Sequence, residues 1–534
     1  MKKMNLIIFG VVLVVIVVVA AVILYRPASQ PLMVLRVSTA GEPITLDPHN
    51  ERSSIDIIIF SQIHETLVSP RWKEGFQLLP GLALSWDLVD NTTWRFCLRE
   101  GLTFHDGTPF NATAVKYNFD RLLDEDRATT SASLIEGKLK SVEIVDEYTV
   151  LFNTVGPWPD LPFASGFDDL GIVSPTAVEK HGDEDYGRHP VGTGPFKFVE
   201  WIEGQYVKLE RNDEYWGDVP KLSEVVFKII PEEGTRYMAF LAGELDIISN
   251  VPPHRAAEIE ADPEMVLLKS MALRTIFFGL NTQRPPLNDV NLRRAIAHTL
   301  DRDSIFEYVL ENLGTVAYVP VPPGGPDRLP EEEYGPGGRY PLDIDEAKRL
   351  IADAGWVDTN DDGIVEKDGQ DLEINFIAPS GRYLKDREIA EVMAEWLEDI
   401  GFRIDLEILE VSDFFSRVTA ADYDMHLLGW GLPAGLDAYL KRIWWTADPD
   451  LGRGAWSAYS SAEYDEFIEL ADGELDPAKR TEYYQEAQRI LMEDVPMIPI
   501  YYTMNIYATT ADVENFEAKA NEAFILIDTT VSTD

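Results

Sequence analysis

A single long apolar segment near the N-terminus sets the first constraint on this chain. Lys2 and Lys3 precede an uncharged run from Leu6 to Leu24 that consists almost entirely of Val, Ile, Leu, Ala, Phe and Gly. The run is about as long as a helix must be to cross a bilayer, and it is longer than the apolar core of a typical signal peptide. Because flanking lysines favour the cytoplasmic side, we expect the chain from Arg26 onward to lie outside the cell membrane.

A cleaved signal peptide, which would leave the protein secreted, is the alternative interpretation of this segment. No clear small-x-small cleavage site follows it, and the absence of a following cysteine excludes lipid attachment there. Both interpretations export the rest of the chain. No second segment of this kind occurs among the 534 residues, so we expect a soluble body that residues 1–32 tether to the membrane.

The charge balance excludes nucleic acid as a partner. Lys and Arg together number 46 against 92 Asp and Glu, which gives a formal net charge of −46. Binding to phosphates needs clustered cations, and none occur here. We interpret the acidity as a solvated surface, because overall charge does not by itself establish an acidic pocket for a cationic ligand.

Strand-like and helix-like segments alternate irregularly along the body. Alternating apolar residues predict strands at 35–38, 92–98 and 141–153. A helix is predicted behind Thr113 as its N-cap, and apolar residues at helical spacing predict another over 389–400. This mixed order predicts an α/β or α+β fold with several domains.

Eight blocks of residues follow one another in an order that resembles a known family. The most diagnostic block runs from Leu84 to Phe110 and includes the turn His105-Asp106-Gly107-Thr108-Pro109. Together the blocks extend from about Leu35 to Asp512 and resemble the family 5 extracellular solute-binding proteins of bacteria and archaea, which serve peptide, nickel and related importers. The other blocks are Pro43 to Pro48, Ala114 to Phe119, Gly192 to Phe196, Asn212 to Gly217, Asn281 to Arg302, Trp430-Gly431 and Tyr464 to Pro499.

The resemblance implies a mixed α/β fold of the periplasmic-binding-protein type, class II, in which two lobes close on a ligand like a hinged trap. The first lobe would combine a domain formed by 33–66, 190–278 and 505–534 with an inserted domain at 67–189. The second lobe would span 279–504, so the chain would cross between lobes near 279 and 504. A hinge of this kind needs only a few residues to change their dihedral angles.

The function that the resemblance implies is the extracytoplasmic binding component of an ABC importer. It would be a monomer without a cofactor that delivers a small peptide or related solute to a permease and ATPase on separate chains. Carriage of nickel, a metal chelate or another non-peptide solute is one alternative, and a sensing or chaperone role is another. A secreted hydrolase is disfavoured because the sequence has no GxSxG or HExxH motif and no recognisable Ser/His/Asp set.

Three separate segments match the positions from which family members line their cleft. Glycine backbone groups can pair with a peptide by strand addition, and aromatic walls tolerate diverse side chains. Ordinary core packing for the tryptophan and a loop position for the glutamate are the competing interpretations. The candidate ligand contacts are Ala40, Gly41 and Glu42, then Ser380, Arg382 and Tyr383, then Trp430 and Gly431.

One departure from the family concerns recognition of a free amine. Amine-recognising members carry an acid shortly after Trp-Gly, whereas here residues 432–436 intervene before Asp437. Either Asp437 takes that role through a different loop path or the ligand is not a free-amine peptide. The eight histidines form no HxH or HxxxH pair, so the sequence does not support a dedicated metal cluster.

A short acidic segment matches the first half of a calcium-binding loop. Gly369 stands where such a loop needs a bidentate glutamate, so we interpret the segment as a surface turn, with weak Ca²⁺ binding as the alternative. The ligands in that alternative would be Asp358, Asn360, Asp362, the carbonyl of Ile364, and Glu366.

Overall fold

The computed structural model describes most of the chain beyond the N-terminal segment. The membrane segment predicted at Leu6 to Leu24 lies outside the described residues, as does the linker up to residue 31. Within the described part, no helix is both long and apolar enough to cross a membrane. The described residues are 32–50, 53–71, 77–127, 129–249, 251, 253–431, 436–446, 458–519 and 523–532.

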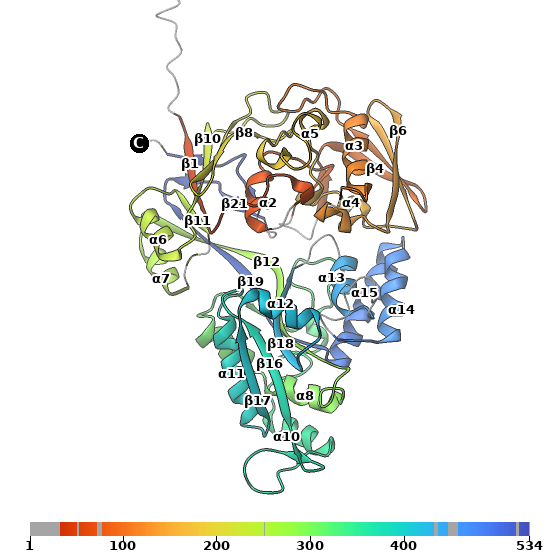
Figure 1. Ribbon diagram of the computed structural model, residues 1–534, viewed down its shortest axis with the longest axis vertical. Helices are drawn as coiled ribbons and strands as arrows, with labels where there is room; N and C mark the ends of the chain where they lie inside the picture. The colour runs from red at the N-terminus through yellow and green to blue at the C-terminus, as the bar shows by residue number, and fades with distance from the viewer. Residues whose placement is uncertain are drawn as a thin grey trace, which may run out of the picture.

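One mixed sheet extends through both lobes of the molecule (Figure 1). Its order is β17-β16-β18-β12-β19-β11-β1-β10-β9-β8, with β13 beside β19. The long antiparallel strands β12 (Met265–Leu280) and β19 (Met497–Thr510) run from one lobe into the other. The remaining strands are β1 (Val34–Thr39), β8 (Phe196–Ile202), β9 (Tyr206–Arg211), β10 (Glu224–Ile229), β11 (Ile247–Ser249), β13 (Thr315–Val316), β16 (Glu373–Pro379), β17 (Arg403–Leu409) and β18 (Met425–Gly431).

The pairing between the two crossing strands is interrupted at two places, after Met271 and between Ile276 and Phe277. Met271 pairs with Met504, but the next pair joins Thr275 to Tyr502, so β12 carries extra residues there. A bulge of this type disrupts the ladder locally and bends the strand. The bulge at 271–275 therefore lies within a strand that runs from one lobe into the other (Figure 1).

The sheet of the first lobe is covered on both faces. Ile247 and its neighbour Ile248 point to opposite faces, as successive residues of a strand do. Ile247 lies in the apolar cluster of α2 (Ser54–Phe60), and Ile248 lies in the cluster of α6 (Glu233–Leu241) and α7 (Pro253–Ala261). This part of the sheet is accordingly a buried layer between helices.

The inserted part of the first lobe is a four-stranded antiparallel sheet with α3 (Ala112–Leu123) packed on it. The predicted single strand at 141–153 is wrong, because the chain turns after Asp146 and forms a hairpin. The predicted N-cap at Thr113 is also wrong, since Asn111 accepts the backbone N–H groups of Thr113 and Ala114. The strands are β4 (Ala83–Asp90), β5 (Thr93–Leu98), β6 (Leu139–Asp146) and β7 (Thr149–Thr154), with β2 (Val68–Arg71), β3 (Gln77–Pro80), α4 (Leu161–Ala164) and α5 (Pro175–His181) around them.

The second lobe is again a sheet between two layers of helices (Figure 1). Phe376 of β16 packs in the cluster that holds α11 (Asp386–Glu398), and the next residue, Ile377, packs in the cluster of α12 (Val411–Thr419). The helix predicted at 389–400 is confirmed as α11. The other helices are α8 (Val290–Thr299) and α10 (Ile344–Asp353) on the first face, and α13 (Leu436–Trp444), α14 (Ala462–Gly473) and α15 (Pro477–Asp494) on the second.

Candidate ligand-binding cleft

Strands from both lobes direct their carboxyl ends toward the boundary between the lobes. β1 runs parallel to β11, which is antiparallel to β19, and β18 is antiparallel to β12. It follows from these pairings that β1 points toward the second lobe and β18 toward the first. Ligands of open α/β sheets bind outside the carboxyl ends of the strands. We call this boundary, between the ends of β1, β16 and β18 and the bulge at 271–275, the interlobe seam.

The first predicted segment directly follows β1 at the seam. Ala40 and Gly41 are partly exposed there, and the hydroxyl of Thr39 donates to the carbonyl of Gly41 at 2.9 Å. The carboxylate of Glu42 accepts the indole N–H of Trp201 at 2.6 Å and the backbone N–H of Gly204 at 2.7 Å. The carboxylate of Glu42 therefore holds this loop against the β8–β9 hairpin.

The second predicted segment follows β16 and is held by a carboxylate that the sequence analysis did not single out. Asp386 accepts the backbone N–H groups of Gly381 at 3.1 Å, Arg382 at 2.7 Å and Tyr383 at 3.0 Å. Ser380 is half-buried and Arg382 is exposed. The sequence signal for Asp386 would have been an acid at the start of a helix behind a glycine-containing loop.

Tyr383 joins the second segment to the third. Its side chain is buried, and its hydroxyl donates to the carbonyl of Gly429 on β18 at 3.1 Å. A Cβ on Gly429 would lie 2.6 Å from the Tyr383 ring, so the close approach of the two segments requires glycine there. The structure therefore brings Ser380 to Tyr383 and Trp430-Gly431 together on the second lobe.

The third predicted segment ends β18 at the level of the bulge. Trp430 pairs with Thr275, and Gly431 pairs with Arg274. Trp430 is half-buried and packs against an apolar cluster made mostly of second-lobe residues. Asp437 falls in the first turn of α13, but its side chain and the loop 432–435 lie outside the described residues.

The residues of the alternative calcium site form a turn in which the carboxylates accept hydrogen bonds from backbone N–H groups. Asp358 accepts the N–H groups of Asn360, Asp361 and Gly363, and Asp362 accepts that of Ile364. Glu366 accepts the N–H of Thr359 in the same way. Among the described residues, no three His, Cys, Asp or Glu side chains lie close enough to hold a metal ion.

The lobes touch each other at the edge of the seam beyond α13. Arg480 of α15 pairs with Asp160 of the inserted sheet domain at 3.0 Å, and the two side chains are 18% and 14% exposed. Phe163 and Phe167, in and after α4, belong to the same apolar cluster as Trp444 of α13. Burial raises the pKa of Asp160, while the charges of Arg480 and Lys138 oppose that rise. This contact therefore joins the two lobes.

Replacing Asp160 by asparagine is expected to shift the ligand-free protein toward an open arrangement. Loss of a largely buried pair that spans the lobes should cost the closed form about 1–2 kcal/mol, or roughly tenfold in the closed-to-open ratio. Small-angle scattering should then show a larger radius of gyration. Asp120→Asn, which breaks an exposed pair with Lys116 within α3, is the control and should leave that radius unchanged.

Comparison with known proteins decides the family. Residues 77–450 match the sequence profile described as bacterial extracellular solute-binding proteins, family 5 middle region. The chain belongs to this family. The predicted resemblance is thereby confirmed, and the family is one of non-catalytic proteins that bind solutes outside the cytoplasm.

Individual relatives support the fold over nearly the full length. The oligopeptide-binding protein AppA of Bacillus subtilis is 30% identical over 502 residues, which are 90% of this chain and 88% of AppA. The structure of AppA with a nonapeptide superposes with a TM-score of 0.75 at 26% identity and covers 94% of this chain and all of that one. NikA from Brucella suis in complex with Fe(III)-EDTA gives a TM-score of 0.81 at 26% identity and covers 93% of this chain and all of NikA. The two-lobed α/β fold of periplasmic binding proteins is confirmed.

Proposed function

We propose that this protein captures a small peptide in the interlobe seam and delivers it to the permease of an ABC importer, whose permease and ATPase are separate chains. The observation that carries the proposal is that the carboxyl ends of β1, β16 and β18 converge on one boundary from opposite lobes. The backbone at Gly41 and Gly431 can pair with an extended peptide there. Similarity to a protein named for oligopeptide binding supports the same ligand class.

The domain division is part of this proposal. The first lobe would comprise 33–66, 190–278 and 505–534 with the inserted domain 67–189, and the second lobe would comprise 279–504. The bulge at 271–275 of β12 would act as the hinge, since a disrupted ladder absorbs changes in dihedral angle more readily than a continuous one. The segment Leu6 to Leu24 would anchor the protein to the outer face of the membrane.

A metal chelate is the second candidate ligand, because the NikA structure that resembles this chain was solved with Fe(III)-EDTA. Native mass spectrometry of the freshly purified body from Gln30 onward distinguishes the two classes by the mass that co-purifies. Calorimetry with a peptide library and with nickel and iron chelates then gives the affinity. A peptide bound 1:1 with compaction in scattering supports the proposal, and binding of chelates alone overturns the peptide assignment.

Trp430→Ala is expected to weaken binding of the captured solute about tenfold or more, which corresponds to about 1.4 kcal/mol. The reason is that Trp430 is only half-buried and ends β18, one of the strands that point toward the seam. Calorimetric Kd values check this. Tyr308→Ala, at a 73% exposed position of the same lobe, is the control and should not change the Kd. Equal Kd values for both variants would mean that Trp430 serves core packing and does not contact the solute.

A further inference from the structure

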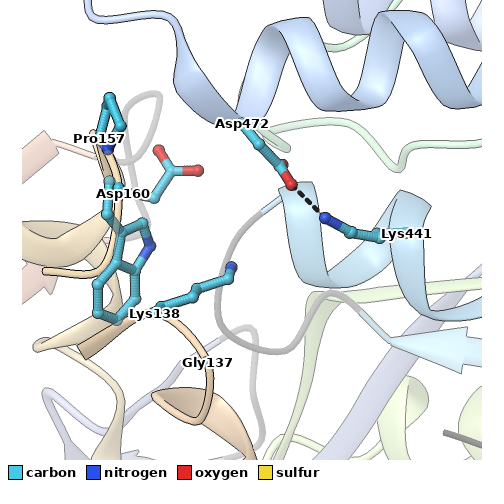
Figure 2. Close-up of a pocket in the computed structure, with 8 residues that line it drawn as sticks. Gly137, Lys138, Pro157, Asp160, Lys441 and Asp472 are labelled. Atoms are coloured by element: carbon cyan, nitrogen blue, oxygen red, sulfur yellow. Dashed lines mark hydrogen bonds and ion pairs between the residues drawn. The ribbon is translucent and has the colours of Figure 1, made fainter. Parts of the chain in front are cut away.

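A cavity of about 210 Å³ lies where the inserted domain meets the second lobe. Figure 2 shows Gly137, Lys138, Pro157 and Asp160 on one side and the ion pair of Lys441 with Asp472 on the other. A water molecule occupies about 30 Å³ of liquid, so the cavity has room for roughly seven waters or for one amino-acid residue. Trp158 and Gly156 complete its lining.

The cavity contains a buried hydrogen-bond donor. Trp158 is 5% exposed, and its indole N–H has no hydrogen-bond partner among the described residues. Its backbone is fixed, because the indole of Trp94 donates to the carbonyl of Trp158 at 3.0 Å. A buried N–H without an acceptor costs free energy, so an acceptor supplied from outside would be favourable at this point.

The charges around the cavity are balanced in two pairs, one within the second lobe and one between the lobes. Lys441 pairs with Asp472 at 2.6 Å, and Arg480 pairs with Asp160. The Lys138 ammonium lies 5.4 Å from the ring centre of Trp158. An added anion would meet the carboxylate of Asp160, and an added cation would meet the ammonium groups of Lys138 and Lys441. A neutral group that accepts from Trp158 and donates to Asp160 meets neither repulsion.

We propose that this cavity is the end pocket of the ligand cleft and binds a neutral amide of the captured solute. An amide carbonyl would accept the indole N–H of Trp158, and its N–H would donate to the carboxylate of Asp160. Lys441 lies on α13, and Trp444 of the same helix belongs to the apolar cluster against which Trp430 packs, so the pocket and the end of β18 border one cluster. This proposal rests on the peptide-binding function. It extends that function by assigning an amide of the bound solute to the pocket at Trp158 and Asp160.

The pocket can be probed directly with three small compounds of similar size. Acetamide, acetate and methylammonium are titrated into the body from Gln30 onward while the indole ¹H–¹⁵N resonances are followed, with that of Trp158 assigned from Trp158→Phe. Acetamide should shift the Trp158 resonance saturably, and the two ions should shift it far less. The resonance of Trp86, which does not line the cavity, is the internal control. If the Trp158 resonance does not shift with acetamide, or shifts equally with all three compounds, the proposal is overturned and the cavity is a water-filled one.

Affinity for a peptide separates this proposal from the function on which it rests. Penta-alanine should bind about tenfold more weakly to Trp158→Phe, which keeps an aromatic ring but loses the indole N–H, than to the wild type or to Trp86→Phe. Equal affinities overturn the end pocket while the peptide-binding function stands. Failure of penta-alanine and the peptide library to bind even the wild type defeats that function, and the acetamide titration still decides whether the pocket binds an amide.

Discussion

Replacing Asp47 by asparagine is expected to lower the free energy of unfolding by about 3–5 kcal/mol, because it removes the main partner of a buried cation. The carboxylate of Asp47 accepts two hydrogen bonds from the guanidinium of Arg121, at 3.0 and 2.6 Å, and the side chains are 1% and 0% exposed. This pair lowers the pKa of Asp47 against the opposing effect of burial. Among the described residues, Arg121 would then keep Asp183, which is 42% exposed, as its one anionic partner. Scanning calorimetry should show the lobe-one transition several degrees lower.

Two comparisons separate the loss of this pair from a general loss of charge. Asp87→Asn breaks the exposed pair with Arg95, at 2.7 Å in the same lobe, and should cost at most about 1 kcal/mol. Replacing both members together, as Asp47→Leu with Arg121→Met, should be less damaging than Arg121→Met alone, since no unpaired charge is then buried. Similar losses for Asp47→Asn and Asp87→Asn would contradict this account.

Asp47 also shows how far the sequence alone could lead. The block Pro43 to Pro48 helped to identify the family, and the family implied the two lobes that the structure shows. Yet the reason for an aspartate at this position is its pairing with Arg121, which is 74 residues away in the chain. Local spacing predicts which face of α11 is buried, as it does for Ile389 and Met393, but it carries no information on such distant pairs.

The places of the candidate site segments in the fold were predictable to the same degree. The three segments named from family positions all lie at strand ends along the seam. The partners that define their roles were not predictable, since Glu42 is held by Trp201 and the loop at Tyr383 by Asp386. The contact of Asp160 with Arg480 depends on how two lobes meet, and periodicity within one segment cannot report on that.

Two buried histidines predict a loss of stability in mild acid. His49 faces the carbonyl of Gly171 with Nε2 at 3.1 Å and a guanidinium N–H of Arg121 with Nδ1 at 2.9 Å, so we assign it as the neutral tautomer with its proton on Nε2. A second proton on Nδ1 would remove that acceptor and oppose the charge of Arg121. Burial, with this charge, lowers the pKa of His49 to about 4. Burial likewise lowers the pKa of His64 to about 3.

Since both pKa values are lower in the folded than in the unfolded chain, the unfolded chain takes up more protons as the pH falls below about 6.5. The contribution of these histidines is therefore complete above pH 6.5 and is lost down to about pH 4 for His49 and about pH 3 for His64. Each should account for on the order of 3–5 kcal/mol, at about 1.4 kcal/mol per pH unit.

Urea unfolding of the body from Gln30 onward, followed by tryptophan fluorescence between pH 7.5 and about 4.5, measures how steeply the free energy of unfolding depends on pH. His49→Asn, whose side-chain oxygen can still accept from Arg121, should reduce the slope by one proton, whereas His254→Gln at an exposed position should leave it as in the wild type. An undiminished slope in His49→Asn would mean that His49 is already charged in the folded protein, which its position between Arg121 and the Gly171 carbonyl argues against.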